Sequence, residues 1–494
     1  MEFANLVFLY LFLPIVLLVY HLMPGIKKRN TVLLVASLLF YAMGQPVYLG
    51  LIVLLSYVNF LLGLSVEKGK FRTLLLPVAL NVAVLALFKY LDFFLGIFGL
   101  VSNDGGFLLS MIKSLTNGLN HIGFSFVEPT TALPIGLSFY TFQVIAYMVD
   151  IYRGESEPES YFKEFLLYLT LFPKLVQGPI ARYSHIGYQL TERKTNYRMV
   201  FDGAQRFAIG LGKKVLLADY CGKVVADLAV SQSDGNLIGA WFSALMFFFQ
   251  IYFDFSGYTD MAIGLGMTFG FRLPENFNLP YTSKSITEFW RRWHITLGAF
   301  FRDYVYIPLG GNRKGRPRQI LNMLAVWLLT GLWHGAGWSF VLWGLYFFAL
   351  LSVEKQIMPR LETWKGWLRH LTTMILVIVG WVIFSHTDIA SLGKALGAMI
   401  GIGGVWAPGL GTRLLNSLPL MLVCFVGITP IPRMLGSIWS GLLGMQKKGK
   451  QASVITPGRV VYLLSVFGFI CLLLWLCTVS LVGASSAPSI YAGF

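Results

Sequence analysis

Two histidines stand out because the segments around them are rich in apolar residues. His334 lies near the centre of the run LTGLWHGAGW, flanked by Gly331, Gly335 and Gly337. Ionisable groups at membrane depth are rare and usually face a bundle interior or a wet cavity. Apolar surroundings keep a histidine neutral, and a neutral imidazole can take a proton from a hydroxyl group. The pattern favours His334 as a general base; a neutral histidine that only packs against a neighbouring helix is the alternative.

His294 belongs to an aromatic and basic stretch between Asn276 and Arg318. Ser285 and Glu288 have the spacing of a capping box, so we predict a helix that begins there and continues to Pro308. A lipid-facing span with so many charges would be too costly. The helix therefore either dips into a protein-lined cavity or lies at the membrane surface, anchored by its aromatic residues.

A second polar set lies in QIYFDFSGYTDMAIGLG. Gln250, Asp254 and Tyr258 recur every four residues and share one face of a predicted helix. Asp254 would be costly at membrane depth unless it is paired. In a functional role, Asp254 would orient a histidine or hold a polar substrate. In a purely structural role, it would pair with a nearby cation.

Composition excludes an ordinary soluble enzyme. Of the 494 residues, 56% are hydrophobic and only 13% are charged, about half the usual charged share. The net charge of +16 is typical of basic cytoplasmic loops and does not require a nucleic-acid partner. The four cysteines show no ligand spacing, so we expect neither a metal site nor a disulfide framework.

We therefore predict an all-α polytopic membrane protein, with about 11–13 membrane helices plus re-entrant or interfacial ones. The positive-inside rule makes the basic segments cytoplasmic and puts both termini outside. A surface helix is expected within 101–129. The expected spans are 3–23, 31–64 (two), 73–100, 133–152, 160–178, 203–230, 237–266, 319–354 (two), 370–385, 391–406, 413–432 and 459–483, and the basic segments lie near Lys27, Lys68 and Lys447.

The motifs FDFSGYTDMAIGLG, PENFNLPY, SITEFWRRWHITLGAFFRDYVYIPLGGNR and LTGLWHGAGW closely resemble the membrane-bound O-acyltransferase family. The likeness is nearest to its bacterial branch that O-acetylates exported polysaccharides such as alginate. It implies helices around a central tunnel in one integral-membrane domain: N-terminal spans over 1–130, the catalytic core over 131–354 and C-terminal spans over 355–494. It also implies a place in the bacterial cytoplasmic (inner) membrane.

By position, His334 corresponds to the residue regarded as the family's catalytic histidine, and His294 to the second histidine of this branch. The donor implied is acetyl-CoA, with no permanently bound cofactor, and His294 is expected to position the thioester or stabilise an oxyanion. A secreted or membrane-tethered acetyltransferase partner would complete transfer to the polysaccharide. Candidate donor-binding residues are Trp290, Arg291, Trp293, Arg302, Arg313, Lys314 and Trp333, where the cations suit phosphates and the indoles suit a tunnel wall.

Two other functions are compatible with these residues. A proton-coupled transporter or flippase would use Asp254, His294 and His334 as a proton relay. Transporters usually have interrupted helices in corresponding positions of two repeated halves, and the first half of this chain has no counterpart of the charged segment 276–318. The second alternative is a teichoic-acid D-alanylation enzyme of the same family. The long C-terminal region and the PLGGNR motif favour polysaccharide acetylation over it.

Overall fold

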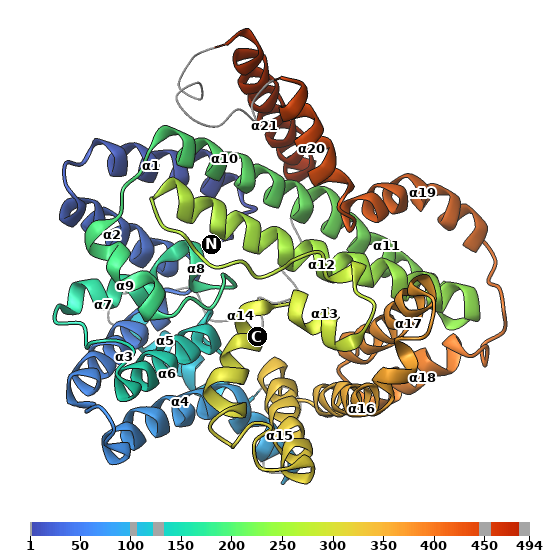
Figure 1. Ribbon diagram of the computed structural model, residues 1–494, viewed down its shortest axis with the longest axis horizontal. Helices are drawn as coiled ribbons and strands as arrows, with labels where there is room; N and C mark the ends of the chain where they lie inside the picture. The colour runs from blue at the N-terminus through green and yellow to red at the C-terminus, as the bar shows by residue number, and fades with distance from the viewer. Residues whose placement is uncertain (1, 99–105, 122–132, 444–455, 484–494) are drawn as a thin grey trace.

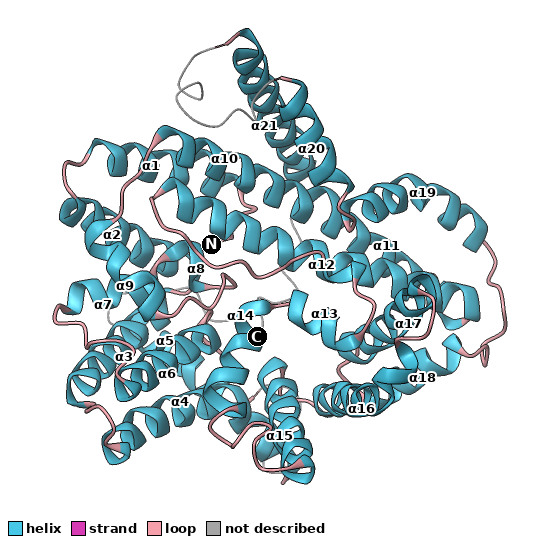
Figure 2. Cartoon of the chain, viewed as in Figure 1, coloured by secondary structure: helices cyan, strands magenta, loops and turns pink. Residues whose placement is uncertain are grey.

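The computed structural model describes residues 2–98, 106–121, 133–443 and 456–483, and every regular element in these ranges is a helix (Figures 1 and 2). Helices satisfy all their backbone groups internally, as a chain in lipid requires. The predicted all-α membrane fold is confirmed. Seven of the described helices are long and apolar enough to cross a membrane: α3 (Pro46–Ser65), α4 (Phe71–Ile97), α12 (Leu237–Thr268), α16 (Trp338–Leu361), α17 (Gly366–Ser385), α19 (Leu410–Gly427) and α21 (Pro457–Gly483).

Other helices, most of them shorter, pack around and between these seven. The expected surface helix corresponds to α5 (Phe107–His121), and the rest of 101–129 lies mostly outside the described residues. The basic segment around Lys447 also lies outside them. The other described helices include α1 (Leu13–Leu22), α2 (Ile26–Gly44), α6 (Leu137–Arg153), α9 (Tyr183–Glu192), α15 (Arg316–His334) and α20 (Ile431–Leu442).

Two expected spans are wrong. The segment 160–178 contains α7 (Phe162–Thr170) and the single turn α8 (Phe172–Leu175), separated at Leu171 by a non-helical residue. The segment 391–406 contains only α18 (Ile389–Met399), after which Gly401 and Gly404 adopt positive φ. Eleven helical residues rise about 16 Å, roughly half of the hydrocarbon core. Neither segment crosses the membrane as a helix.

The longest described helix, α12, pairs with a continuous helical stretch formed by α10 (Tyr197–Gly212), a π-helical turn (Lys213–Ala218) and α11 (Asp219–Val230), and the two lie side by side in Figure 1. Glycines let the backbones touch: a Cβ at Gly210 would lie 2.5 Å from the Gly257 carbonyl oxygen, and one at Gly264 2.6 Å from that of Gly203. Neither position admits a side chain without separating the helices.

Two short helices, α13 (Ile286–Arg292) and α14 (Ile295–Phe301), lie in the middle of the molecule in Figure 1, with α12 on one side and α15 and α16 on the other. Each has seven residues and rises only about 10 Å. Both are too short to cross a membrane, and their position among α12, α15 and α16 is that expected of a re-entrant segment, which needs protein around it at membrane depth.

Candidate functional site

The start of α13 is the predicted one. The Ser285 hydroxyl accepts a hydrogen bond from the Glu288 backbone N–H at 3.0 Å, as in a capping box. The Glu288 carboxylate in turn accepts from the backbone N–H of Lys284 at 2.9 Å. Glu354 of α16 accepts from the N–H groups of Ile286 and Thr287, at 2.6 and 2.9 Å. The helix N-terminus is thus fully capped inside the protein.

The end of this helix is not the predicted one. Instead of continuing to Pro308, the helix stops at Trp293, and His294 adopts a left-handed backbone conformation with φ of 44° before α14 begins. Asn276 imposes the break from outside the helix. Its backbone oxygen accepts from the Ile295 N–H at 3.0 Å, and its side-chain oxygen accepts from the Thr296 N–H at 3.2 Å. These bonds replace helical ones and offset the strain at His294.

The same Asn276 oxygen sets the tautomer of His294. Because the Thr296 N–H can only donate, the atom it reaches must be the amide oxygen, and His294 Nδ1, 3.1 Å away, must carry a hydrogen to donate to it. Neutral His294 therefore presents a lone pair at Nε2. That atom is buried and has no hydrogen-bond partner among the described residues.

His334 is the last residue of α15, with 3% of its surface exposed. Two carbonyls at this helix end, those of Leu332 and Trp333, accept hydrogen bonds from Tyr90 and Lys89 of α4. The Leu332 carbonyl also accepts from the backbone N–H of Gly335, so the two side chains complete the hydrogen bonding of this helix end. The position of the His334 backbone is therefore fixed by a neighbouring helix.

Aromatic rings surround both histidines. The centroid of the Trp333 ring lies 4.7 Å from that of His334 and 6.0 Å from that of His294, so one indole contacts both imidazoles. Further rings complete the wall: Phe255 of α12 lies 4.7 Å from His294, Trp343 of α16 and Phe384 of α17 lie 5.0 and 5.1 Å from His334, and Phe139 of α6 lies 5.6 Å from Trp333.

The two other tryptophans predicted for this site form its outer layer. The Trp290 ring lies 5.5 Å from that of Trp343, which contacts His334. The Trp293 ring lies 4.8 Å from that of Trp381 and 6.2 Å from that of Tyr252. Both therefore support the aromatic wall.

Several buried donors in this wall lack a hydrogen-bond partner among the described residues. They are the indole N–H groups of Trp290, Trp333 and Trp343 and the amide nitrogen of Asn276. Most buried polar groups are paired, and exceptions call for an explanation such as water or a ligand. A cluster of unpaired donors beside two histidines is an arrangement that the carbonyl and hydroxyl oxygens of bound reactants would complete.

The predicted supporting residues lie away from the histidines. Asp254 pairs with Lys214 at 2.8 Å, while its neighbour Phe255 faces His294. Tyr258 stacks on Phe3 with 4.8 Å between ring centroids. Gln250 lines a surface hollow of about 960 Å³ between α11, α12, α17 and α18. The residue that orients a histidine is Asn276, which the sequence did not single out, and not Asp254.

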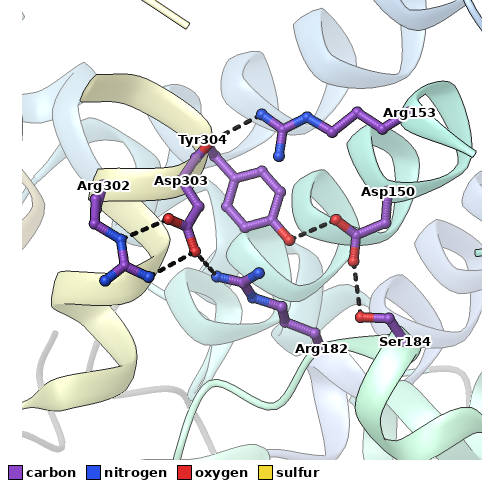
Figure 3. Close-up of polar contacts among 7 residues, drawn as sticks. All are labelled: Asp150, Arg153, Arg182, Ser184, Arg302, Asp303 and Tyr304. Atoms are coloured by element: carbon purple, nitrogen blue, oxygen red, sulfur yellow. Dashed lines mark hydrogen bonds and ion pairs between the residues drawn. The ribbon is translucent and has the colours of Figure 1, made fainter. Parts of the chain in front are cut away.

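Of the predicted cations, Arg302 belongs to a polar network at the end of α6 (Figure 3). Its guanidinium donates to Asp303 at 2.6 Å, and Arg182 donates to the same carboxylate. Burial raises the pKa of Asp303, but hydrogen bonds from Arg302 and Arg182 outweigh it, so this pKa lies below its ordinary value. Arg291, Arg313 and Lys314 are exposed.

The same network joins α6 to the segment after α14. The Tyr304 hydroxyl donates to Asp150 at 2.6 Å, and Ser184 donates to the other oxygen of that carboxylate at 3.1 Å. Arg153 donates to the Asp303 backbone oxygen at 2.8 Å and lies 5.2 Å from the centre of the Tyr304 ring. Three arginines and two carboxylates therefore meet where α6 ends.

Comparison with known proteins is consistent with this geometry. Residues 33–393 match the model of MBOAT, the membrane-bound O-acyltransferase family. The chain is 38% identical to the probable alginate O-acetylase AlgI of Pseudomonas syringae pv. tomato, over 82% of this chain and 76% of that protein. It is 35% identical to the peptidoglycan O-acetyltransferase of Helicobacter pylori, over 82% and 80%. Similarity to the teichoic acid D-alanyltransferase of Bacillus subtilis is lower, 27% over 51% and 68%.

Proposed function

The chain belongs to the membrane-bound O-acyltransferase family, and from that premise we propose that it moves acetyl groups from cytoplasmic acetyl-CoA to hydroxyl groups of an exported polysaccharide or cell-wall polymer. The similarities to an alginate O-acetylase and a peptidoglycan O-acetyltransferase support this acceptor class, since each extends over more than four fifths of the chain. The D-alanyltransferase likeness covers only about half of it.

The observation that carries the proposal is the meeting of His294 and His334 on one indole, among unpaired buried donors. His334 takes the proton of the acceptor hydroxyl as its oxygen attacks the thioester carbonyl. The tetrahedral oxyanion collapses, the carbon–sulfur bond breaks, and the departing thiolate receives the proton from the His334 imidazolium. One ester and one thiol result, and the histidine is restored.

The lone pair at Nε2 of His294 gives this residue a different part. A neutral imidazole with that tautomer accepts a hydrogen bond and cannot donate one from Nε2 to an oxyanion. His294 is therefore suited to accept a hydrogen bond from another N–H or O–H group of a bound reactant, since the reacting hydroxyl gives its one hydrogen to His334. The indole N–H of Trp333 supplies a donor near the reacting carbonyl.

Charge distribution supports the proposed donor side. Arg291, Arg302, Arg313 and Lys314 lie on or next to the re-entrant segment, where they are suited to hold the phosphates of coenzyme A. The positive-inside rule puts these loops in the cytoplasm and both chain ends outside, in a bacterial cytoplasmic membrane. The acetyl group would then leave on the outer side, to a secreted or membrane-tethered partner and finally to the polymer.

The test is transfer of labelled acetyl from acetyl-CoA to polymer in membranes that contain the acceptor. We expect His334→Gln to lower the rate by about 100- to 10,000-fold, because the base is lost. His185→Ala, which changes an exposed histidine, serves as the control and should keep the wild-type rate. Wild-type transfer by His334→Gln would overturn the catalytic assignment. Proton flux without thioester turnover would favour a transporter instead.

A further inference from the structure

Lys174 is a buried cation that the catalytic scheme leaves unused. It lies in α8, which follows α7 after the non-helical Leu171, and its side chain is fully buried. Its ammonium donates to the Gln143 side-chain oxygen and lies 4.4 Å from the centre of the Tyr168 ring. Among the described residues it forms no ion pair with a carboxylate. Burial without a carboxylate lowers the pKa of Lys174 well below its ordinary value, and a ligand that offers oxygen acceptors would stabilise its charged form.

Gln143, which accepts the hydrogen bond from Lys174, also has unused hydrogen-bonding capacity. Its side chain is fully buried, and its amide nitrogen has no hydrogen-bond partner in the described part of the chain. The ammonium and the amide therefore offer N–H donors at one place, while the only acceptor between them, the Gln143 oxygen, is already taken. Such a pair is suited to a ligand that presents oxygen acceptors.

The place of this pair along α6 indicates which ligand. Phe139, Gln143, Ala146 and Asp150 follow one another at helical spacing, so they share one face of α6, and all four are fully buried. At one end of that face, Phe139 contacts the rings of Trp333 and His294. At the other end, Asp150 belongs to the arginine network of Figure 3. Lys174 and Gln143 lie between the histidines and the arginines.

The length of this face matches the arm of the proposed donor. From Phe139 to Asp150, α6 rises about 16 Å. In coenzyme A, thirteen bonds separate the thioester sulfur from the nearest phosphorus, and at about 1.25 Å of advance for each they extend roughly 16 Å. Two amide groups interrupt that arm. With the acetyl group at the histidines and the phosphates at the arginines, an amide carbonyl falls at mid-length.

We propose that Lys174 and Gln143 bind the amide oxygens of the pantetheine arm of the acyl donor and so position the thioester beside the two histidines. The inference rests on the proposed function and assigns a positioning role to two residues that do not touch the reacting atoms. The donor supplies the acceptor that the Gln143 amide nitrogen lacks among the described residues, and a further acceptor for the Lys174 ammonium beside the Gln143 oxygen.

The test compares Lys174→Met with the wild type on three donors: acetyl-CoA, S-acetylpantetheine and S-ethyl thioacetate, which has no amide. We expect kcat/KM to fall about 10- to 100-fold on the first two donors, because a hydrogen bond from a charged group is lost. On S-ethyl thioacetate the two proteins should differ by about twofold or less. Lys223→Met removes an exposed cation beside Tyr220 and is the matched control, with wild-type values on every donor.

A second variant keeps the inference falsifiable if Lys174→Met folds poorly. Gln143→Glu gives Lys174 an internal carboxylate, which should preserve the fold, occupy the ammonium and reproduce the amide-dependent loss. An equal loss on all three donors, in either variant, would overturn the assignment of Lys174 and Gln143 and leave the proposed function standing. Absence of wild-type turnover with every donor, in membranes that contain the acceptor, would overturn both.

Discussion

Two lysines are buried in the part of the chain that the structure describes, and their surroundings differ in one respect. Lys214, in the π-helical turn between α10 and α11, lies 2.7 Å from Asp219 and 2.8 Å from Asp254. Among the described residues, Lys174 in α8 has a hydrogen bond to the amide oxygen of Gln143 and the face of Tyr168, but no carboxylate. The first charge is neutralised by the protein itself. By our proposal, Lys174 instead receives a further oxygen acceptor from the bound acyl donor.

The same contrast between paired and unpaired polar groups separates the contact of α10 with α12 from the surroundings of the two histidines. Beside Lys214, the charges between α10 and α12 are matched again: Lys213 contacts Asp260 at 2.6 Å, and Arg206 contacts Asp260 and Glu275 at 2.9 and 2.5 Å. Around the histidines, buried nitrogens have no partner among the described residues. Matched charges tie helices together, whereas unmatched donors mark the place where reactants complete the structure.

The largest effect is expected where the matching is broken. Lys214→Met leaves Asp219 and Asp254 buried without their cation, and we expect the free energy of unfolding to fall by about 3–5 kcal/mol. Thermal unfolding in detergent measures the loss. Adding Asp254→Asn to Lys214→Met should recover part of it, since one orphaned carboxylate is then removed. An unchanged melting temperature for Lys214→Met would show that the ion pairs do not hold α10 and α12 together.

The next effect concerns the turn that orients His294. Asn276→Leu removes the oxygen that accepts from His294 Nδ1 and from the N–H of Thr296, while nearly conserving volume. We expect kcat to fall about 100-fold, because a misplaced group next to the reaction costs that much. Asn276→Asp retains an acceptor and should retain most of the rate. If both variants lose activity equally, the acceptor at position 276 does not set the geometry of His294.

The smallest effect concerns the exposed basic turn. Replacing Arg313 and Lys314 together by Ala should raise KM for acetyl-CoA about 3- to 10-fold with little change in kcat, because exposed ion pairs contribute little. The ratio of the KM of the double variant to that of the wild type should shrink at high salt, because salt screens exposed charges. Arg198→Ala, an exposed cation on α10, is the control. An unchanged KM in the double variant would leave the turn with a topological role alone.

Much of the site was predictable because its signals are local. An ionisable residue in an apolar run identifies His334, and a capping box identifies the start of α13. The same intramembrane rule applies to Lys174 in LFPKLVQGPIARY, so the sequence carried a signal for that residue as well. The aromatic wall was partly predictable, since Trp290, Trp293 and Trp333 all contribute to it.

The remainder depends on contacts between distant parts of the chain. The break at His294 has no glycine or proline to signal it and is imposed by Asn276, eighteen residues away. The partner of Asp254 lies forty residues earlier, on the helical stretch that pairs with α12. Hydropathy could not distinguish α7 and α8 from a full span, because short helices buried inside the protein are as apolar as a crossing helix.

The most direct measurement takes Lys174→Met and Lys214→Met through the same two assays, thermal unfolding and acetyl transfer from acetyl-CoA per folded molecule. We expect opposite outcomes: Lys174→Met melts at or above the wild-type temperature but transfers poorly, whereas Lys214→Met melts well below it and transfers normally while folded. Should activity simply follow stability in both variants, the distinction between matched and unmatched buried charge would be contradicted.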